Sequence, residues 1–285
     1  MNHVILKLLA QRIALALLSL LAVSVIVFSI TAVLPGDAAQ EQLGQDATPE
    51  AVAALRAQMG LDVPAPERYA KWLLGMVKGD LGRSATTQMP VAELVASRLP
   101  NSLLLAAVTA LFSVPIALAL GIASAVWRGS WFDRAASTTA VGVVSVPEFL
   151  VATLAVLVLC CVIVAQMMRM TRAAVIDQLE APYIEMVRLK GASPMRMVLA
   201  HALPNAVGPI ANAVAMTLSY LLGGVIIVET IFNYPGVASL MVDGVTQRDM
   251  PLVQTCAMLF CAAYLALVTL ADIVSIVANP RLRYR

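Results

Sequence analysis

The chain has 285 residues, of which 60% are hydrophobic and only 13% are charged, and its mean hydropathy is +0.86. Soluble domains are nearer half apolar and a quarter charged, so this composition indicates an integral membrane protein. The net charge of +2, without any basic run in the sequence, excludes nucleic acid as an expected partner. The four cysteines lie inside apolar segments, where a thiol packs as a small hydrophobe, and their spacing predicts neither a disulfide framework nor a metal site.

Five apolar segments are long enough to cross a bilayer, which takes about 20 residues of helix. They are 13–34, 101–126, 136–168, 205–231 and 252–278. The first has an apolar run of 22 residues. Signal peptides have shorter apolar runs, of roughly 7–15 residues, and no convincing small-residue cleavage site follows, so we expect a retained span. The predicted fold class is an all-α integral membrane protein with five clear apolar helices.

The one long polar region, residues 35–100, contains two short helical patterns. In the first, Thr48 is a suitable N-cap and Pro49 takes the first helical position. The second, PERYAKWLLGMVKGD, carries Tyr69 and Trp72 on one apolar face. These features predict a short extracytoplasmic helical cap that rests on the membrane interface, with a solvated loop as the alternative.

The positions of the basic residues constrain how many times the chain crosses the membrane. Four basic places are expected on the cytoplasmic side: the N-terminus, 127–134, 169–196 and the C-terminal tail. The chain must therefore cross the membrane an even number of times between 127–134 and 169–196. The apolar stretch between them, 136–168, is about 50 Å long as one helix, which is too long for one upright span and too short for two. The sequence leaves five or six spans open.

A charged island, YIEMVRLKGASPMRMVLAHALPN at 183–205, stands in this apolar chain. Pro182 favours the start of a helix, and Gly191 favours a left-handed end. Ser193 and Pro194 then suit the N-cap and first position of a second helix. The island is thus predicted to be a pair of short helices bounded by breaks, which is the form of a rigid contact element.

The island resembles the cytoplasmic coupling loop of permease subunits of ATP-binding-cassette importers. The loop pattern is Glu-Ala-Ala, three residues, Gly, nine residues, Ile, one residue, Leu-Pro. Gly191 and Leu203-Pro204 stand at their places in it, whereas the two alanines and the Ile are replaced. The resemblance implies that the following residues contact an ATPase: Glu185, Met186, Val187, Arg188, Lys190, Gly191, Ala192, Ser193, Leu203 and Pro204.

Further motifs along the chain are similar to one branch of these permeases. LPGDAA, KGDLGRS, SVPEF, VETIFNYPGVASLM and NPRLRYR resemble the dipeptide, oligopeptide and nickel family, in particular the first of its two permease subunits. The resemblance implies a multi-pass permease of the bacterial inner membrane that translocates peptides. A nickel or other small-solute importer is the alternative substrate class.

The resemblance also implies partners. They are a second permease subunit, two cytoplasmic ATPase subunits, an extracytoplasmic substrate-binding protein and membrane lipid. This chain would need no cofactor, because ATP is bound by the partner subunits, and its sequence has no phosphate-binding loop. Residues 1–34 would form the N-terminus and first span, 35–100 the cap, and 101–285 the permease core with the coupling loop at 169–204.

One departure from the family pattern concerns the middle of the chain. In the family, a separate fourth span leads into the coupling loop, whereas here VLVLCCVIVAQM runs straight into MRMTRAA. We therefore expect an internal deletion near residues 160–168 that merges the third and fourth of six family spans. A non-transporting remnant is the resulting alternative to a working permease.

Three acidic residues, Glu148, Glu229 and Asp272, lie in or at the ends of apolar segments. Charge within a membrane is costly and often functional, so each either faces the transport pathway or makes a structural pair. An intramembrane enzyme is not expected. The two histidines, His3 and His201, belong to no plausible constellation, and the sequence has no Gly-x-Ser-x-Gly or His-Glu-x-x-His motif.

Overall fold

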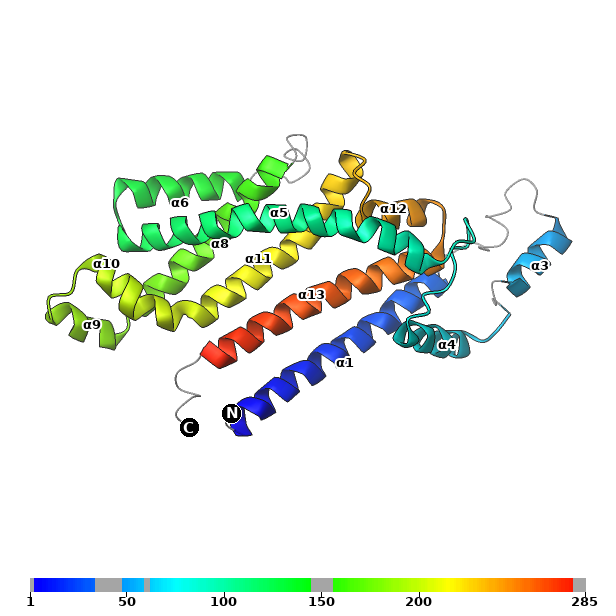
Figure 1. Cartoon of the computed structure of the whole chain (residues 1–285), viewed down its shortest axis with the longest axis horizontal. Coiled ribbons are helices and arrows are strands. Elements are labelled where there is room, and N and C mark those ends of the chain that lie inside the picture. Colours follow the sequence, from blue (N-terminus) through cyan, green and yellow to red (C-terminus); the bar gives the residue numbers. More distant parts are fainter. Residues whose placement is uncertain (1–2, 34–47, 59–61, 145–155, 279–285) are drawn as a thin grey trace. The chain divides into compact units, whose positions relative to one another are not determined.

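The computed structural model describes residues 3–33, 48–58, 62–144 and 156–278, and every regular element within them is a helix (Figure 1). In chain order the helices are α1 (His3–Val33), α3 (Pro49–Gln58), α4 (Ala65–Lys78), α5 (Val91–Val126), α6 (Trp131–Val144), α8 (Val156–Leu179), α9 (Pro182–Leu189), α10 (Pro194–Arg196), the π-helix η3 (Met197–Ala202), α11 (Leu203–Ile231), α12 (Val237–Thr246) and α13 (Met250–Ala278). The chain divides into two compact units. The first comprises 1–16, 104–232 and 264–285, and the second comprises 17–103 and 233–263.

Four helices in the described residues are long and apolar enough to cross a membrane. They cover Leu6–Thr31, Val91–Val126, Pro194–Ile231 and Met250–Val277. These four correspond to the first, second, fourth and fifth apolar segments of the sequence, so the all-α fold class and four of its predicted spans are confirmed.

The helices found in the third apolar segment differ from the sequence-based prediction. The expected merged helix over 136–168 is wrong, because α6 ends at Val144 and a separate helix, α8, begins at Val156. The two helices pack against each other in antiparallel order. Asp133, at the start of α6, bonds to Arg172 near the end of α8, and Ala140 shares a buried cluster with Ala165.

The α6–α8 pair is therefore a hairpin that begins and ends at one end of the first unit. Arg128, just before α6, forms an ion pair with Glu180, just after α8, with 2.7 Å between Nη1 and Oε1. The basic stretch 127–134 and the start of the charged island therefore lie at the same end of this unit.

Small residues allow the hairpin to approach α5 closely. A Cβ atom added at Gly121 of α5 would lie 2.8 Å from the carbonyl oxygen of Met168 and 2.8 Å from the Cβ atom of Thr171 on α8. Met168 is itself buried with Ala140 and Ala165, against partly buried Leu120 of α5. Membrane helices pack most tightly where small residues let their backbones meet, so Gly121 fixes the position of α8 on α5.

In the second unit, the aromatic face of α4 packs on α1. The rings of Tyr69 and Trp72 lie 5.4 and 5.8 Å from the ring of Phe28, measured between centroids. The Tyr69 hydroxyl also hydrogen-bonds to the hydroxyl of Ser24, at 2.8 Å. The predicted N-cap of α3 is confirmed, since Thr48 Oγ1 accepts from the backbone N–H of Ala51 at 3.3 Å. The placement of the extracytoplasmic helical cap, predicted for residues 35–100, on a membrane interface stays a prediction.

A buried carboxylate, Asp249, ties a loop of the second unit to the start of α13. It accepts hydrogen bonds from the backbone N–H of Ala85 at 3.1 Å and from Thr86 Oγ1 at 3.0 Å, and it also bonds to the hydroxyl of Ser84. Its Oδ1 atom accepts from the N–H of Leu252 in the first turn of α13, at 3.3 Å. Asp249 is 1% exposed, so these donors replace the water that its charge would otherwise require.

Candidate functional site

The charged island folds as the sequence predicts. Pro182 occupies the first turn of α9, and Gly191, just beyond its end, has φ +77°, a conformation that suits glycine. Ser193 is the N-cap of α10, with Pro194 next to it, and its Oγ atom accepts from the N–H of Arg196 at 3.4 Å. Because both helices start at a proline and a glycine separates them, the island has fixed boundaries.

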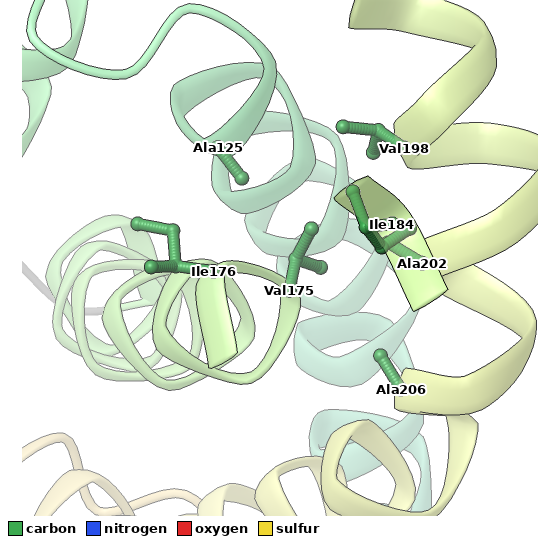
Figure 2. Packing of buried hydrophobic residues seen from close by; sticks show 7 residues of the cluster. All are labelled: Ala125, Val175, Ile176, Ile184, Val198, Ala202 and Ala206. Atoms are coloured by element: carbon green, nitrogen blue, oxygen red, sulfur yellow. The ribbon is translucent and has the colours of Figure 1, made fainter. Parts of the chain in front are cut away.

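One side of α9 is anchored to the rest of the first unit. Ile184, which is 4% exposed, belongs to a buried cluster with residues of α5, α8, η3 and α11 (Figure 2). The cluster members are Ala125, Val175, Ile176, Ile184, Val198, Ala202 and Ala206. Residues of four other helices, α5, α8, η3 and α11, thus pack around the inner side of α9.

A hydrogen-bonded group on Tyr183 reinforces this anchor. Asn205 of α11 donates from Nδ2 to the Tyr183 hydroxyl at 3.2 Å and to the carbonyl of His201 at 2.9 Å. The Tyr183 hydroxyl in turn donates to the same His201 carbonyl at 3.4 Å. These bonds connect the first turn of α9 to the first turn of α11.

A π-helix joins the island to α11. Pro204 has no N–H to bond to the carbonyl of Ala200, and its ring would clash with that carbonyl in a regular α-helix. The wider π-helical turn, η3, occupies Met197–Ala202, and its C-cap is Leu203, directly before this proline. The Leu-Pro step of the island thus coincides with a change of helix type where the span begins.

The outer side of α9 is exposed and largely apolar. Tyr183, Met186 and Leu189 follow one another at intervals of three residues and are 38%, 61% and 79% exposed. Met195 on α10 is 50% exposed. Exposed apolar side chains on a short helix that lies at the basic end of its unit are a typical contact surface for another protein.

Of the predicted contact residues, Glu185, Met186, Arg188, Lys190 and Gly191 are exposed, whereas Val187 is half-buried. Ala192 and Leu203 are also half-buried, and Ser193 and Pro204 are exposed. The structure therefore brings most of these side chains to one exposed segment. Glu185 lies in the first turn of α9 and Arg188 in the last, where each charge complements the helix dipole.

A charged pair stabilises the hairpin next to this segment. Arg172 donates from Nε to Asp133 Oδ1 at 2.6 Å and from Nη2 to Oδ2 at 2.8 Å, so the two residues form a bidentate salt bridge. Both residues lie outside the apolar segment 136–168. The hydrogen bonds from Arg172 hold the pKa of the Asp133 carboxyl below its ordinary value, although burial acts in the opposite direction. Asp133 therefore stays ionised at neutral pH.

The three acidic residues predicted within the membrane have different surroundings. Asp272 on α13 lies in a salt bridge with Arg12 on α1, with 3.0 Å between Oδ2 and Nη1. The role of Asp272, in the transport pathway or in structure, stays a prediction. Glu229 on α11 is fully buried. Glu148 lies outside the described residues.

Sequence reasoning missed three residues that hold the island in place: Tyr183, Ile184 and Asn205. Ile184 and Val187 are three positions apart, which is the spacing of one buried helix face, so the anchoring side of α9 was detectable. The contact between Tyr183 and Asn205 joins residues 22 positions apart and leaves no periodic signal.

Two family models match the chain and together cover nearly all of it. One, described as binding-protein-dependent transport system inner membrane component, matches residues 91–284. The other, described as the N-terminal part of a binding-protein-dependent transport system membrane component, matches residues 5–106.

Curated proteins similar to this chain include glutathione transport system permease proteins named GsiC. The chain is 33% identical to that of Salmonella paratyphi A and 34% identical to that of Escherichia coli K12. Each alignment runs over 292 residues and covers 94% of this chain and 95% of the relative.

Proposed function

The chain belongs to the binding-protein-dependent transport system inner membrane components, and on that premise we propose that it moves small peptides across the bacterial inner membrane. As a permease subunit of an ABC importer, it is an inner-membrane protein with several membrane-spanning helices and is not itself catalytic. The family implies an ATPase and a substrate-binding protein as partners. We assign it one further permease subunit and two ATPase subunits, and these ATPases bind the nucleotide.

The exposed side of α9 is the docking surface for one ATPase subunit. The single observation that carries this proposal is the combination of the exposed stripe of Tyr183, Met186 and Leu189 with the buried anchor of Ile184 on the opposite side. An ATPase groove that holds the stripe would move α9 when it closes on ATP. The Ile184 cluster would pass that movement to α8 and α11, because packed interiors transmit displacement rather than absorb it.

A cysteine crosslink tests the docking surface. We expect Leu189→Cys, at the most exposed residue of the stripe, to crosslink to the ATPase subunit in an assembled importer, with a yield that changes during ATP turnover. Val77→Cys on α4 is the matched control. Val77 is apolar like Leu189 and is exposed to nearly the same extent, 78%, but it lies in the other unit. Equal yields from the two positions, or no crosslink from Leu189→Cys under turnover, would contradict the proposal.

The substrate assignment to small peptides, glutathione among them, rests on the relatives at 33–34% identity. The importer should be reconstituted in vesicles with its binding protein, and uptake of labelled glutathione and of a labelled dipeptide should be measured. We expect ATP-dependent uptake of at least one of them, with excess unlabelled peptide as competitor. Uptake of a nickel complex that peptides do not inhibit would instead support the small-solute alternative.

A second candidate is an assembly partner that no longer transports. The observation that favours it is that four helices of the described residues are long and apolar enough to cross a membrane, against the six spans that the family resemblance implies. The same reconstitution distinguishes the two. ATP hydrolysis in an assembled complex without uptake of peptide or nickel would support the assembly partner.

A further inference from the structure

A groove runs between α6 and α8 on the outer side of the hairpin. It encloses about 400 Å³ and is lined by Ser137 and Val141 of α6 and by Gln166, Arg169, Met170, Arg172 and Ala173 of α8. The α6 residues are four positions apart, and Gln166 and Ala173 of α8 each lie three or four positions from both Arg169 and Met170, so each set lies on one helix face. The opposite face of α8 carries the buried residues Thr171 and Val175, which leaves the groove on the open side.

The groove carries a net positive charge. Arg169 is exposed, and no ion pair involves it among the described residues. The neighbouring Arg172 is engaged with Asp133, so these two charges compensate each other. The guanidinium of Arg169 therefore remains available for an anion, while Val141, Met170 and Ala173 make the adjoining surface apolar.

Two exposed tryptophans indicate the depth of this groove in a membrane. Trp127 and Trp131, at the turn between α5 and α6, are 53% and 83% exposed. Tryptophans of this kind concentrate at the boundary between headgroups and acyl chains. Asp133 lies two residues after Trp131 and binds Arg172, and Arg169 precedes Arg172 by about one helical turn of 5 Å toward the apolar part of α8. Arg169 therefore lies below that boundary along the helix, at a depth from which the long arginine side chain can reach up to the lipid phosphates.

We propose that the α6–α8 groove binds an anionic phospholipid of the cytoplasmic leaflet. The lipid phosphate lies on the guanidinium of Arg169, whose planar fork suits the oxygens of a phosphate. An acyl chain runs along Val141 and Met170, and Ser137 and Gln166 offer hydrogen bonds to the glycerol and ester groups. Basic pockets between membrane helices on the cytoplasmic side typically hold such headgroups. The bound lipid covers the hairpin next to the segment that moves with α9.

Native mass spectrometry of the assembled importer tests this site. The complex is delipidated in mild detergent and titrated with phosphatidylglycerol or phosphatidylcholine. We expect preferential retention of phosphatidylglycerol, and Arg169→Gln should reduce that retention by about tenfold because it removes the charge that binds phosphate. Arg134→Gln is the matched control, because Arg134 is an exposed arginine of the same hairpin outside the groove, and it should change retention less than about twofold. Equal retention in the two variants, or equal retention of the two lipids, would overturn the proposal.

A second variant tests the groove without a change of charge. Val141→Trp fills the apolar part of the groove at an exposed position and should reduce phosphatidylglycerol retention as Arg169→Gln does. Millimolar inorganic phosphate should not displace the lipid, because the acyl chain contributes to binding. Displacement by phosphate, or an efficient crosslink from Val141→Cys to the second permease subunit, would show that no lipid occupies this groove.

Discussion

The charged island and the α6–α8 hairpin are neighbours in the first unit, but their structures have different origins. The island is set by local signals: a proline opens α9, Gly191 follows its end, and Ser193 caps α10. The hairpin is set by contacts between residues far apart in the chain, such as Asp133 with Arg172, 39 positions away. Local signals are readable in a sequence, whereas such long-range pairs are not.

Because the hairpin depends on such long-range contacts, the sequence alone left open how the two basic stretches could lie on one side. A continuous apolar run of 33 residues carries no mark of where a chain reverses. The reversal is stabilised by the charged pair at its base and by the small residues Gly121, Ala140 and Ala165. The described residues thus contain four long apolar helices and the α6–α8 hairpin, whose two ends meet at one end of the first unit.

The largest effect is expected from removal of the charged pair of the hairpin. Asp133→Ala should lower the free energy of unfolding by about 3 kcal/mol, because it leaves Arg172 partly buried without its partner. Glu180→Ala breaks the neighbouring pair with Arg128, whose side chains are both more than half exposed, and should cost at most about 1 kcal/mol. Denaturation in detergent micelles measures both. Equal losses would show that the hairpin does not depend on the buried pair.

The same pair gives a pH dependence. The folded-state pKa of Asp133 is lowered from its ordinary value of 3.8, so its contribution to stability is complete above that value. The contribution is lost as pH falls below 3.8 through the lower folded-state pKa. Asp133→Asn should remove this part of the acid-induced loss of stability, measured between pH 5 and pH 2. An unchanged acid profile in the variant would contradict the assignment.

A smaller effect is expected at the contact between α5 and α8. Gly121→Ala should destabilise the protein by about 1–3 kcal/mol, because the added methyl group meets the carbonyl of Met168 at 2.8 Å and forces the helices apart. Gly142→Ala on α6 is the control, since nothing lies within 4 Å of its added Cβ atom. It should instead stabilise α6 by up to about 1 kcal/mol through helix propensity. The two substitutions should therefore change stability in opposite directions. A loss of stability in both variants would contradict close packing at Gly121.

The smallest effect is expected in the island. Ser193→Ala removes the N-cap of α10 and should cost about 0.5–1 kcal/mol, at the low end because the bond to the Arg196 N–H is long, at 3.4 Å, and exposed. Ser193→Asp keeps an acceptor at the cap and should restore the loss. Denaturant titration measures the stability of both variants, and equal losses would show that the Ser193 side chain does not stabilise α10 as an N-cap.

The sequence predicted the four long apolar helices and the boundaries of the island from hydrophobicity, prolines and Gly191. It also predicted the apolar face of α4, but it did not indicate that Tyr69 and Trp72 pack on Phe28. The merged third helix was a wrong prediction, because hydrophobicity alone does not distinguish one long helix from two that fold back. The anchor formed by Tyr183 and Asn205 was likewise missed, since it depends on the return path of η3 and α11.

The central claim is that the hairpin returns the island to the side of the 127–134 loop. Single cysteines at Arg134 and Leu189 test it most directly, in a background where the four native cysteines are replaced by serine or alanine. A membrane-impermeant thiol reagent is applied to vesicles of known orientation. We expect both positions to react only from the cytoplasmic side, and reaction of the two positions from opposite sides would contradict this placement.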